Sequence, residues 1–246
     1  MEIIVKSSLD GSCQPSLFFP ARGEGRPLIV GLHTWSYDRN NQITNLLPEA
    51  EKHDFNLLLP EFRGPNLMSN PKCTEACASP LAVRDVLDAI EYVSGEYSID
   101  TESIFLIGLS GGGHMALMVA ANAPELFRAV ASYVPITDLA AWCEENPNYR
   151  PHVEACCGRR EEMLLRSPIS YVDSLSRANL KIFHGKFDNV VPMEQSLRLY
   201  QSIMAMAPRS RVFLDIFDGG HEIDMKAAMY WLLSQYNEKN LNEVTG

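Results

Sequence analysis

The chain has 246 residues, 46% of them apolar, and a net charge of −10, which suits one α/β domain whose core needs no metal or disulfide. An acidic chain without a basic run is a poor partner for nucleic acid, and it offers no polybasic patch to anionic lipid. No apolar run reaches the length of a membrane helix and no leader pattern opens the sequence, so we expect a cytoplasmic protein without a nucleic-acid or membrane partner.

Short apolar runs alternate with helical patterns along the chain, as is typical of βαβ units around a mostly parallel sheet. The first two strands are expected at Glu2–Lys6 and Ser16–Phe19, on either side of an Asp10-Gly11 turn signal. Further strands are expected at Pro27–Leu32, Phe55–Leu59, Ile104–Leu109, Ala129–Val134, Leu180–Phe183 and Val212–Phe217. Helices are expected at Asn45–His53, Leu81–Tyr92, Met115–Ala121, Gln195–Met206 and Ala227–Tyr236, with a frayed polar tail from Asn237.

These elements predict a single α/β domain over residues 1–246, with about eight strands and helices on both faces of the sheet. One stretch, residues 135–179, carries Pro, Trp and charged residues but no strand pattern. Segments this long without strands are usually lids or binding insertions. We therefore expect a cap there, with Trp142 in the roof of a substrate pocket.

The strongest motif is Gly108-Leu109-Ser110-Gly111-Gly112, a G-x-S-x-G pattern between an expected strand and an expected helix. Serine on such a sharp turn has a strained backbone, and the glycines keep neighbouring side chains from colliding. The turn lifts the hydroxyl above the sheet edge, at a helix N-terminus whose free N–H groups suit a developing oxyanion. Ser110 is therefore the expected nucleophile.

A serine nucleophile needs a base, and in this strand–turn–helix context the acid and the histidine follow the serine along the chain. His221 lies in a loop after the last strand, from which it can reach over the sheet edge, and is the expected base. His184 lies at a strand end, where we expect a buried, structural histidine. His114, one turn after Ser110, is expected to pack inside.

The acid should hold the imidazole in its reactive tautomer. Asp188 follows the Leu180–Phe183 strand and is the preferred candidate, with Asp138, one strand earlier, as the alternative. Asp215 lies inside a strand and looks structural.

An oxyanion hole needs a second N–H beside that of Gly111, the residue after the nucleophile. The loop His33-Thr34-Trp35-Ser36 follows the Pro27–Leu32 strand and can supply the amide of Trp35. Trp35 can also pack over the pocket, and both roles are compatible. Thr34 stands where glycine is usual and is a candidate for substrate contact.

With Ser110, Asp188 and His221 in place, the chain resembles the catalytic domain of the prolyl oligopeptidase family and its esterase-like relatives. Four further stretches carry the resemblance: Phe62-Arg63-Gly64-Pro65-Asn66, Asp85-Val86-Leu87-Asp88-Ala89-Ile90, Arg166-Ser167-Pro168-Ile169-Ser170 and Asp188-Asn189-Val190-Val191-Pro192. The resemblance implies the α/β-hydrolase fold and a serine hydrolase that needs no metal or organic cofactor. It also places Arg63 and Asn66 at the carboxyl edge of the sheet, where they either hold substrate or, through an Arg–carboxylate tie, fix the loop.

Prolyl oligopeptidases proper carry an N-terminal β-propeller that screens substrates by size, whereas here the first core strand is expected already at residue 27. We therefore expect an esterase acting on a small-molecule carboxylic ester, such as a small acyl, sugar or aryl ester. A serine peptidase on short peptides is the alternative, followed by a non-catalytic binding protein of the same fold. The sequence leaves a homo-oligomer open.

Six cysteines occur in the chain, including the C-x3-C pair Cys73 and Cys77 and the adjacent Cys156 and Cys157. No second pair at zinc-ligand spacing accompanies them, so we expect no metal site. Free, partly buried thiols are the preferred interpretation, and one disulfide joining the two cysteine-bearing loops is the alternative.

Overall fold

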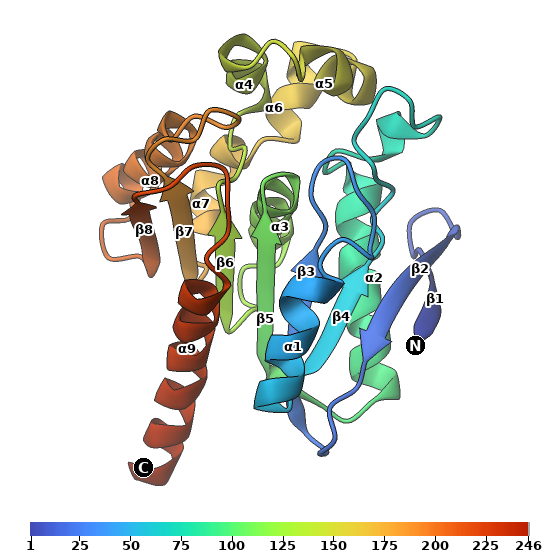
Figure 1. Cartoon of the computed structure of the whole chain (residues 1–246), viewed down its shortest axis with the longest axis vertical. Helices are drawn as coiled ribbons and strands as arrows, with labels where there is room; N and C mark the ends of the chain where they lie inside the picture. The colour runs from blue at the N-terminus through green and yellow to red at the C-terminus, as the bar shows by residue number, and fades with distance from the viewer. Residues whose placement is uncertain (246) are drawn as a thin grey trace.

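The computed structural model describes the backbone of residues 1–245 and the side chains of residues 1–237. Its centre is an eight-stranded sheet in the order β1-β2-β4-β3-β5-β6-β7-β8 (Figure 1). The strands are β1 Glu2–Lys6, β2 Cys13–Phe19, β3 Arg26–Leu32, β4 Asn56–Pro60, β5 Ile99–Leu109, β6 Ala129–Tyr133, β7 Leu180–Gly185 and β8 Val212–Phe217. Strands β1 and β2 form an antiparallel hairpin, β2 pairs antiparallel with β4, and all other pairs are parallel. The predicted mostly parallel sheet is confirmed.

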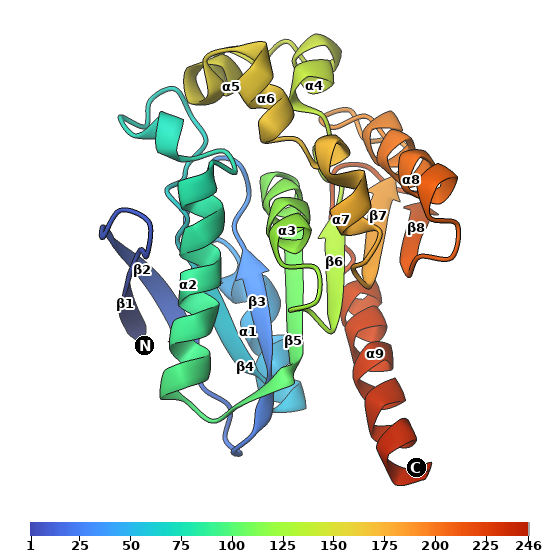
Figure 2. The same ribbon diagram turned by 180° about the vertical axis from the view of Figure 1, so that it is seen from behind.

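Helices cover both faces of the sheet. Helices α2 Pro80–Glu96, α3 Gly111–Asn122, α7 Val172–Leu175 and α8 Glu194–Met206 lie on one face (Figure 2), and α1 Ile43–His53 and α9 Met225–Thr245 lie on the other (Figure 1). Helix α2 buries Val83, Val86, Ile90 and Val93 at helical spacing against the sheet. Helix α3 is apolar on all sides, and every residue from 111 to 121 is buried. This central helix therefore holds the end of β5 in a fixed place.

Residues 135–179 form a layer of short helices over the carboxyl ends of the strands (Figure 1). Its helices are α4 Leu139–Glu145, α5 Arg150–Cys157 and α6 Arg160–Leu165, followed by the 3-10 turn η2 Pro168–Tyr171 and by α7. A second 3-10 turn, η1 Cys73–Glu75, lies in the loop after β4 and packs against α5. Apolar side chains of the layer share a small core with Trp35, Cys77 and Val191. The segment 135–179 is thus packed down onto the loops that surround Ser110.

Several elements begin or end a few residues from their expected bounds, and the largest differences are at β5 and α9. Strand β5 begins at Ile99, five residues early, because Arg26 pairs with Ile99 ahead of a register shift in the β3 ladder. The added residues of β5 include charged side chains, so a search for apolar runs does not detect this part of the strand. The expected frayed tail is also wrong, since α9 continues as a helix to Thr245. Polar residues such as Glu and Lys are good helix formers, so a polar sequence does not exclude a helix.

None of the helices that the structure describes combines the length and the apolar character that a membrane crossing requires.

Candidate active site

Ser110 lies on the tight turn between β5 and α3, with φ 55° and ψ −119°. Its backbone N–H donates to the carbonyl of Tyr133 at the end of β6 (2.9 Å), and its own carbonyl accepts from the His114 N–H (2.8 Å). A side chain at Gly108 would collide with the carbonyl of Gly112. The turn therefore has the strained, glycine-flanked geometry that the motif predicts.

His221 and Asp188 form a hydrogen-bonded pair. Their Nδ1 and Oδ2 atoms are 2.7 Å apart. The other oxygen of Asp188 accepts the backbone N–H groups of Val190 (2.8 Å) and Val191 (2.9 Å). Burial of the carboxyl opposes ionisation, but hydrogen bonds from His184, His221 and the Val191 amide hold the pKa of Asp188 well below its usual range. Asp188 is thus an ionised carboxylate placed to accept an Nδ1–H of His221.

His184 also contacts this carboxylate, a contact that the sequence pattern did not reveal. The ring is fully buried, with Nδ1 2.6 Å from the hydroxyl of Ser196 and Nε2 2.9 Å from the carbonyl of Val191. Its Nε2 also lies 3.5 Å from Oδ2 of Asp188. The expected buried, structural His184 is confirmed, and it supports the loop that carries Asp188.

The other candidates for acid and base have different partners. Asp138 caps α4, where its side chain accepts from the Ala141 N–H (3.0 Å). Asp215 pairs with Lys181 at 2.9 Å on the β7–β8 ladder. His114 is buried with Nε2 2.6 Å from the Arg166 carbonyl, and burial lowers its pKa to about 4. None of these three side chains contacts His221.

The loop that carries His221 crosses the same sheet edge as Ser110. The Phe187 N–H donates to the Gly219 carbonyl (2.9 Å), and Gly185 at the end of β7 lies directly under the carbonyl of Gly220. Among the described residues, no hydrogen bond joins Ser110 to His221. Catalytic contacts are often long in unliganded enzymes and tighten when substrate binds, so this geometry does not exclude the expected pairing of Ser110 with His221.

Two backbone amides meet at the N-terminus of α3. A Cβ built on Gly111 would lie 2.5 Å from the nitrogen of Trp35, so the two residues are in close backbone contact. The carbonyl of Trp35 accepts from the Asn66 N–H (2.8 Å), whereas no hydrogen bond of the described residues occupies the Trp35 N–H. The oxyanion hole expected from Gly111 and Trp35 stays a prediction, which this close contact supports.

Thr34 lies beside this pair. Its N–H donates to the side chain of Asn41 (3.0 Å), and the residue is only half-buried, so its side chain is open to a ligand. The preceding His33 stacks on Phe62 with ring centroids 3.7 Å apart and lies 3.2 Å from Glu61. These contacts hold the loop that presents Trp35.

The structure does not support a substrate contact for Trp142. Its side chain is buried, with a relative exposure of 1%, and its indole N–H donates to the carbonyl of Val190 (2.9 Å). The ring packs edge-on against Trp35 and close to Tyr149. Trp142 therefore ties the helical layer to the loop that carries Asp188, instead of lining a pocket.

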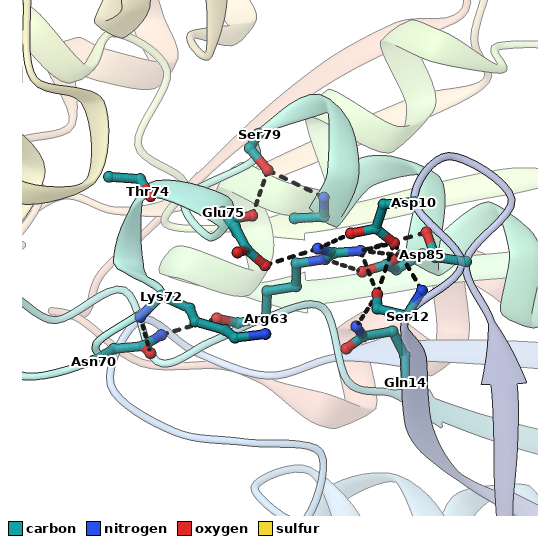
Figure 3. Close-up of polar contacts among 12 residues, drawn as sticks. Asp10, Ser12, Gln14, Arg63, Asn70, Lys72, Thr74, Glu75, Ser79 and Asp85 are labelled. Atoms are coloured by element: carbon teal, nitrogen blue, oxygen red, sulfur yellow. Dashed lines mark hydrogen bonds and ion pairs between the residues drawn. The ribbon is translucent and has the colours of Figure 1, made fainter.

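Arg63 is a structural residue, and the expectation that it holds substrate is corrected in favour of the carboxylate tie. Its side chain is 2% exposed and its guanidinium contacts three carboxylates: Asp85 of α2 (2.6 Å), Asp10 of the β1–β2 turn (2.8 Å) and Glu75 of η1 (2.8 Å). Figure 3 shows the guanidinium group of Arg63 surrounded by these carboxylates and by Ser12. The positive charge of Arg63 is therefore balanced by carboxylates of the protein itself.

Asn66 has a similar role. Its side-chain oxygen accepts from the Cys77 N–H (2.7 Å), and its own N–H holds the Trp35 carbonyl. The residue is buried. Asn66 thus positions the Trp35 loop, and its expected contact with substrate is not supported.

All six cysteines are free, and four of them are buried. Within the part of the chain that the structure describes, no group of three or more histidine, cysteine or acidic side chains has the geometry of a metal site.

Comparison with known proteins identifies the family. A sequence model described as the prolyl oligopeptidase family matches residues 81–237. The acylamino-acid-releasing enzyme of Rattus norvegicus is 29% identical over 144 residues, which cover 54% of this chain but only 19% of the rat protein. The matched segment therefore corresponds to about a fifth of that relative.

Solved structures agree on the fold. The acylaminoacyl peptidase of Pyrococcus horikoshii superposes with a TM-score of 0.71 at 21% identity, over 90% of this chain and 37% of that one. An esterase from Pyrococcus furiosus superposes with a TM-score of 0.69 at 15% identity, over 90% of this chain and 82% of that one. The chain has the α/β-hydrolase fold, as predicted.

The Arg63 network predicts a large loss of stability in Arg63→Met. The variant leaves Asp85, whose side chain is fully buried, without its cation, so the free energy of unfolding should fall by about 3–5 kcal/mol. Arg177→Met is the matched control, because the Arg177–Asp173 pair is exposed and should contribute about 0–1 kcal/mol. Denaturant unfolding measures both. Unchanged stability together with a strongly raised KM would contradict this role and would favour a substrate contact for Arg63.

The Ser110 turn predicts that removing the side chain relieves strain. Glycine adopts positive φ freely, so Ser110→Gly should raise the free energy of unfolding by about 1 kcal/mol, while Ser110→Ala keeps its Cβ and should change little. Thermal unfolding of the two variants side by side is the measurement. Equal stabilities would show that the turn is unstrained.

Proposed function

Because the chain belongs to the prolyl oligopeptidase family, we propose that it is a serine hydrolase that cleaves carboxylic esters with Ser110, His221 and Asp188. The observation that carries the proposal is the ionised Asp188 bound to His221 on the sheet edge that also presents the strained Ser110 turn. A lone serine hydroxyl is a weak nucleophile, so this pair supplies what Ser110 needs.

In the first step, Nε2 of His221 takes the proton of Ser110 as the serine oxygen attacks the acyl carbon. Asp188 accepts the Nδ1–H, which leaves Nε2 as the base, and its negative charge stabilises the imidazolium that forms. His221 then gives the proton to the departing alkoxide, which leaves as an alcohol. The acyl group stays on Ser110.

The negative oxygen of the tetrahedral intermediate would lie between the N–H groups of Gly111 and Trp35. The close backbone contact of the two residues supports this assignment, because donors on a fixed backbone need no reorganisation when charge develops. In the second step a water, deprotonated by His221, attacks the acyl-enzyme, and the acid is released as Ser110 regains its proton.

The choice of an ester over an amide rests on the leaving group. An alkoxide leaves readily, whereas an amine must be protonated by a histidine already aligned with both groups. An ester therefore makes the smaller demand on His221 and is the preferred substrate. Cleavage of short acylated peptides is the second candidate, and it is favoured by the match to the rat acylamino-acid-releasing enzyme.

A substrate panel tests the proposed reaction. We expect kcat/KM to be higher for aryl acetates and butyrates than for N-acetyl-aminoacyl anilides, and Ser110→Ala to lose both activities and its labelling by a fluorophosphonate probe. Faster cleavage of the anilides would favour the peptidase. A Ser110→Ala variant as active as the natural protein would exclude both.

The oxyanion hole predicts that Gly111→Ala is nearly inactive. The new Cβ would lie 2.5 Å from the Trp35 nitrogen and 2.6 Å from its Cα, and backbone atoms cannot rotate away. Moving the Trp35 amide should lower kcat by about 10²–10³. Gly95→Ala in α2 is the control, since no atom lies within 4 Å of its added Cβ and activity should be unchanged. Near-normal turnover of a folded Gly111→Ala protein would contradict the assignment of these amides.

A further inference from the structure

Tyr133, the last residue of β6, contacts both the nucleophile turn and the end of the His221 loop. Its backbone carbonyl accepts the N–H of Ser110 (2.9 Å). Its hydroxyl donates to the backbone carbonyl of Asp224 (2.8 Å), three residues after His221. One buried residue thus links two segments that lie more than 100 positions apart in the sequence.

The aromatic ring of Tyr133 is held firmly between these two contacts. It stacks on Phe183 of β7, with ring centroids 4.3 Å apart and planes 4° from parallel, and Phe217 at the end of β8 lies beside it. Burial, with Asp224 and Asp215 nearby, raises the pKa of the Tyr133 hydroxyl far above its usual value. The hydroxyl therefore stays a neutral donor at any pH at which the protein functions.

The His221 loop is fixed at its two ends. At its start, the Lys186 N–H donates to the Phe217 carbonyl (2.9 Å). At its other end, the Asp224 carbonyl accepts the Ala228 N–H as α9 begins (3.0 Å), and the Tyr133 hydroxyl joins this point to β6.

A cleft of about 740 Å3 lies against the same loop. It is lined by Tyr133 and Phe183, by the loop residues Asp218, Glu222 and Ile223, and by the start of α9. The loop is therefore not packed on this side. The hydrogen bond from the buried Tyr133 hydroxyl to Asp224 therefore has more influence on the position of the loop than it would in a filled core.

We propose that Tyr133 is a positioning residue that sets the distance between Ser110 and His221; this inference rests on the proposed hydrolase function. Proton transfer requires His221 within about 2.6–3.2 Å of the Ser110 hydroxyl. Tyr133 holds the backbone of Ser110 at one end and the anchor of the His221 loop at the other. It touches no reacting atom itself.

Tyr133→Phe tests the inference, because it removes only the hydroxyl and keeps the stacked ring and the backbone contact to Ser110. We expect kcat on an aryl ester to fall about tenfold, as for the loss of one buried hydrogen bond, with KM within twofold. The rate of fluorophosphonate labelling should fall in parallel, and backbone amides of residues 218–224 should exchange hydrogen faster.

A control variant separates positioning from general stability. Tyr171→Phe removes a similar hydroxyl-to-carbonyl hydrogen bond, to Leu165 (2.7 Å), away from the His221 loop and should leave kcat unchanged.

A Tyr133→Phe protein with normal kcat and slower or unchanged hydrogen exchange in the loop would overturn the inference. If turnover still depends on Ser110 in that case, only the role of Tyr133 fails. If Ser110→Ala is itself fully active, the proposed function fails as well, so the two failures are distinguishable.

Discussion

The structure depends on the close approach of backbones around Ser110. A Cβ at Gly112 would lie 2.5 Å from the Leu32 carbonyl, and one at Gly111 would lie 2.5 Å from the Trp35 nitrogen, so α3 can approach β3 and its following loop only because these positions are glycine. This approach places the start of α3 beside the Trp35 amide. It also forces Ser110 into positive φ, a conformation that costs stability and that the buried helix α3 maintains. The strained turn at Ser110 and the close contact of Gly111 with Trp35 thus occur at a single packing constraint.

The arrangement of Asp188 and His221 depends on a different constraint: the buried carboxylate of Asp188 needs hydrogen-bond donors. One oxygen of Asp188 accepts hydrogen bonds from two backbone amides, and the other contacts His221. The ring of the buried His184 lies 3.5 Å from this second oxygen. Because hydrogen bonds hold the pKa of Asp188 well below its usual range, protonation of Asp188 should not limit activity on the acid side of neutrality. The helical layer over the site adds to this support, since Trp142 donates to the same loop.

Residues whose role follows from a local pattern could be predicted from the sequence, and residues whose role follows from distant partners could not. Ser110 is proposed from its glycine motif, and Asp188 and His221 from chain order and loop position; the structure shows the hydrogen bond between Asp188 and His221. Arg63 was ambiguous because its partners Asp10 and Asp85 lie 53 and 22 positions away, and no pattern shows that they converge. Tyr133 gave no signal, since an aromatic residue in a buried strand is ordinary. The predicted β5 was too short for a related reason: its first residues are charged, and Ile99 pairs with Arg26 of the distant strand β3.

The central claim is that Ser110 and His221 act as one unit. It is tested most directly by a double-mutant cycle of Ser110→Ala and His221→Ala, with kcat/KM measured on an aryl ester and folding checked for each protein. The account predicts that each single variant loses at least about 10³ and that the double variant is no slower than the worse of the two, because either change disables the same step. Losses that multiply in the double variant, or a His221→Ala protein within a few-fold of the natural one, would contradict it.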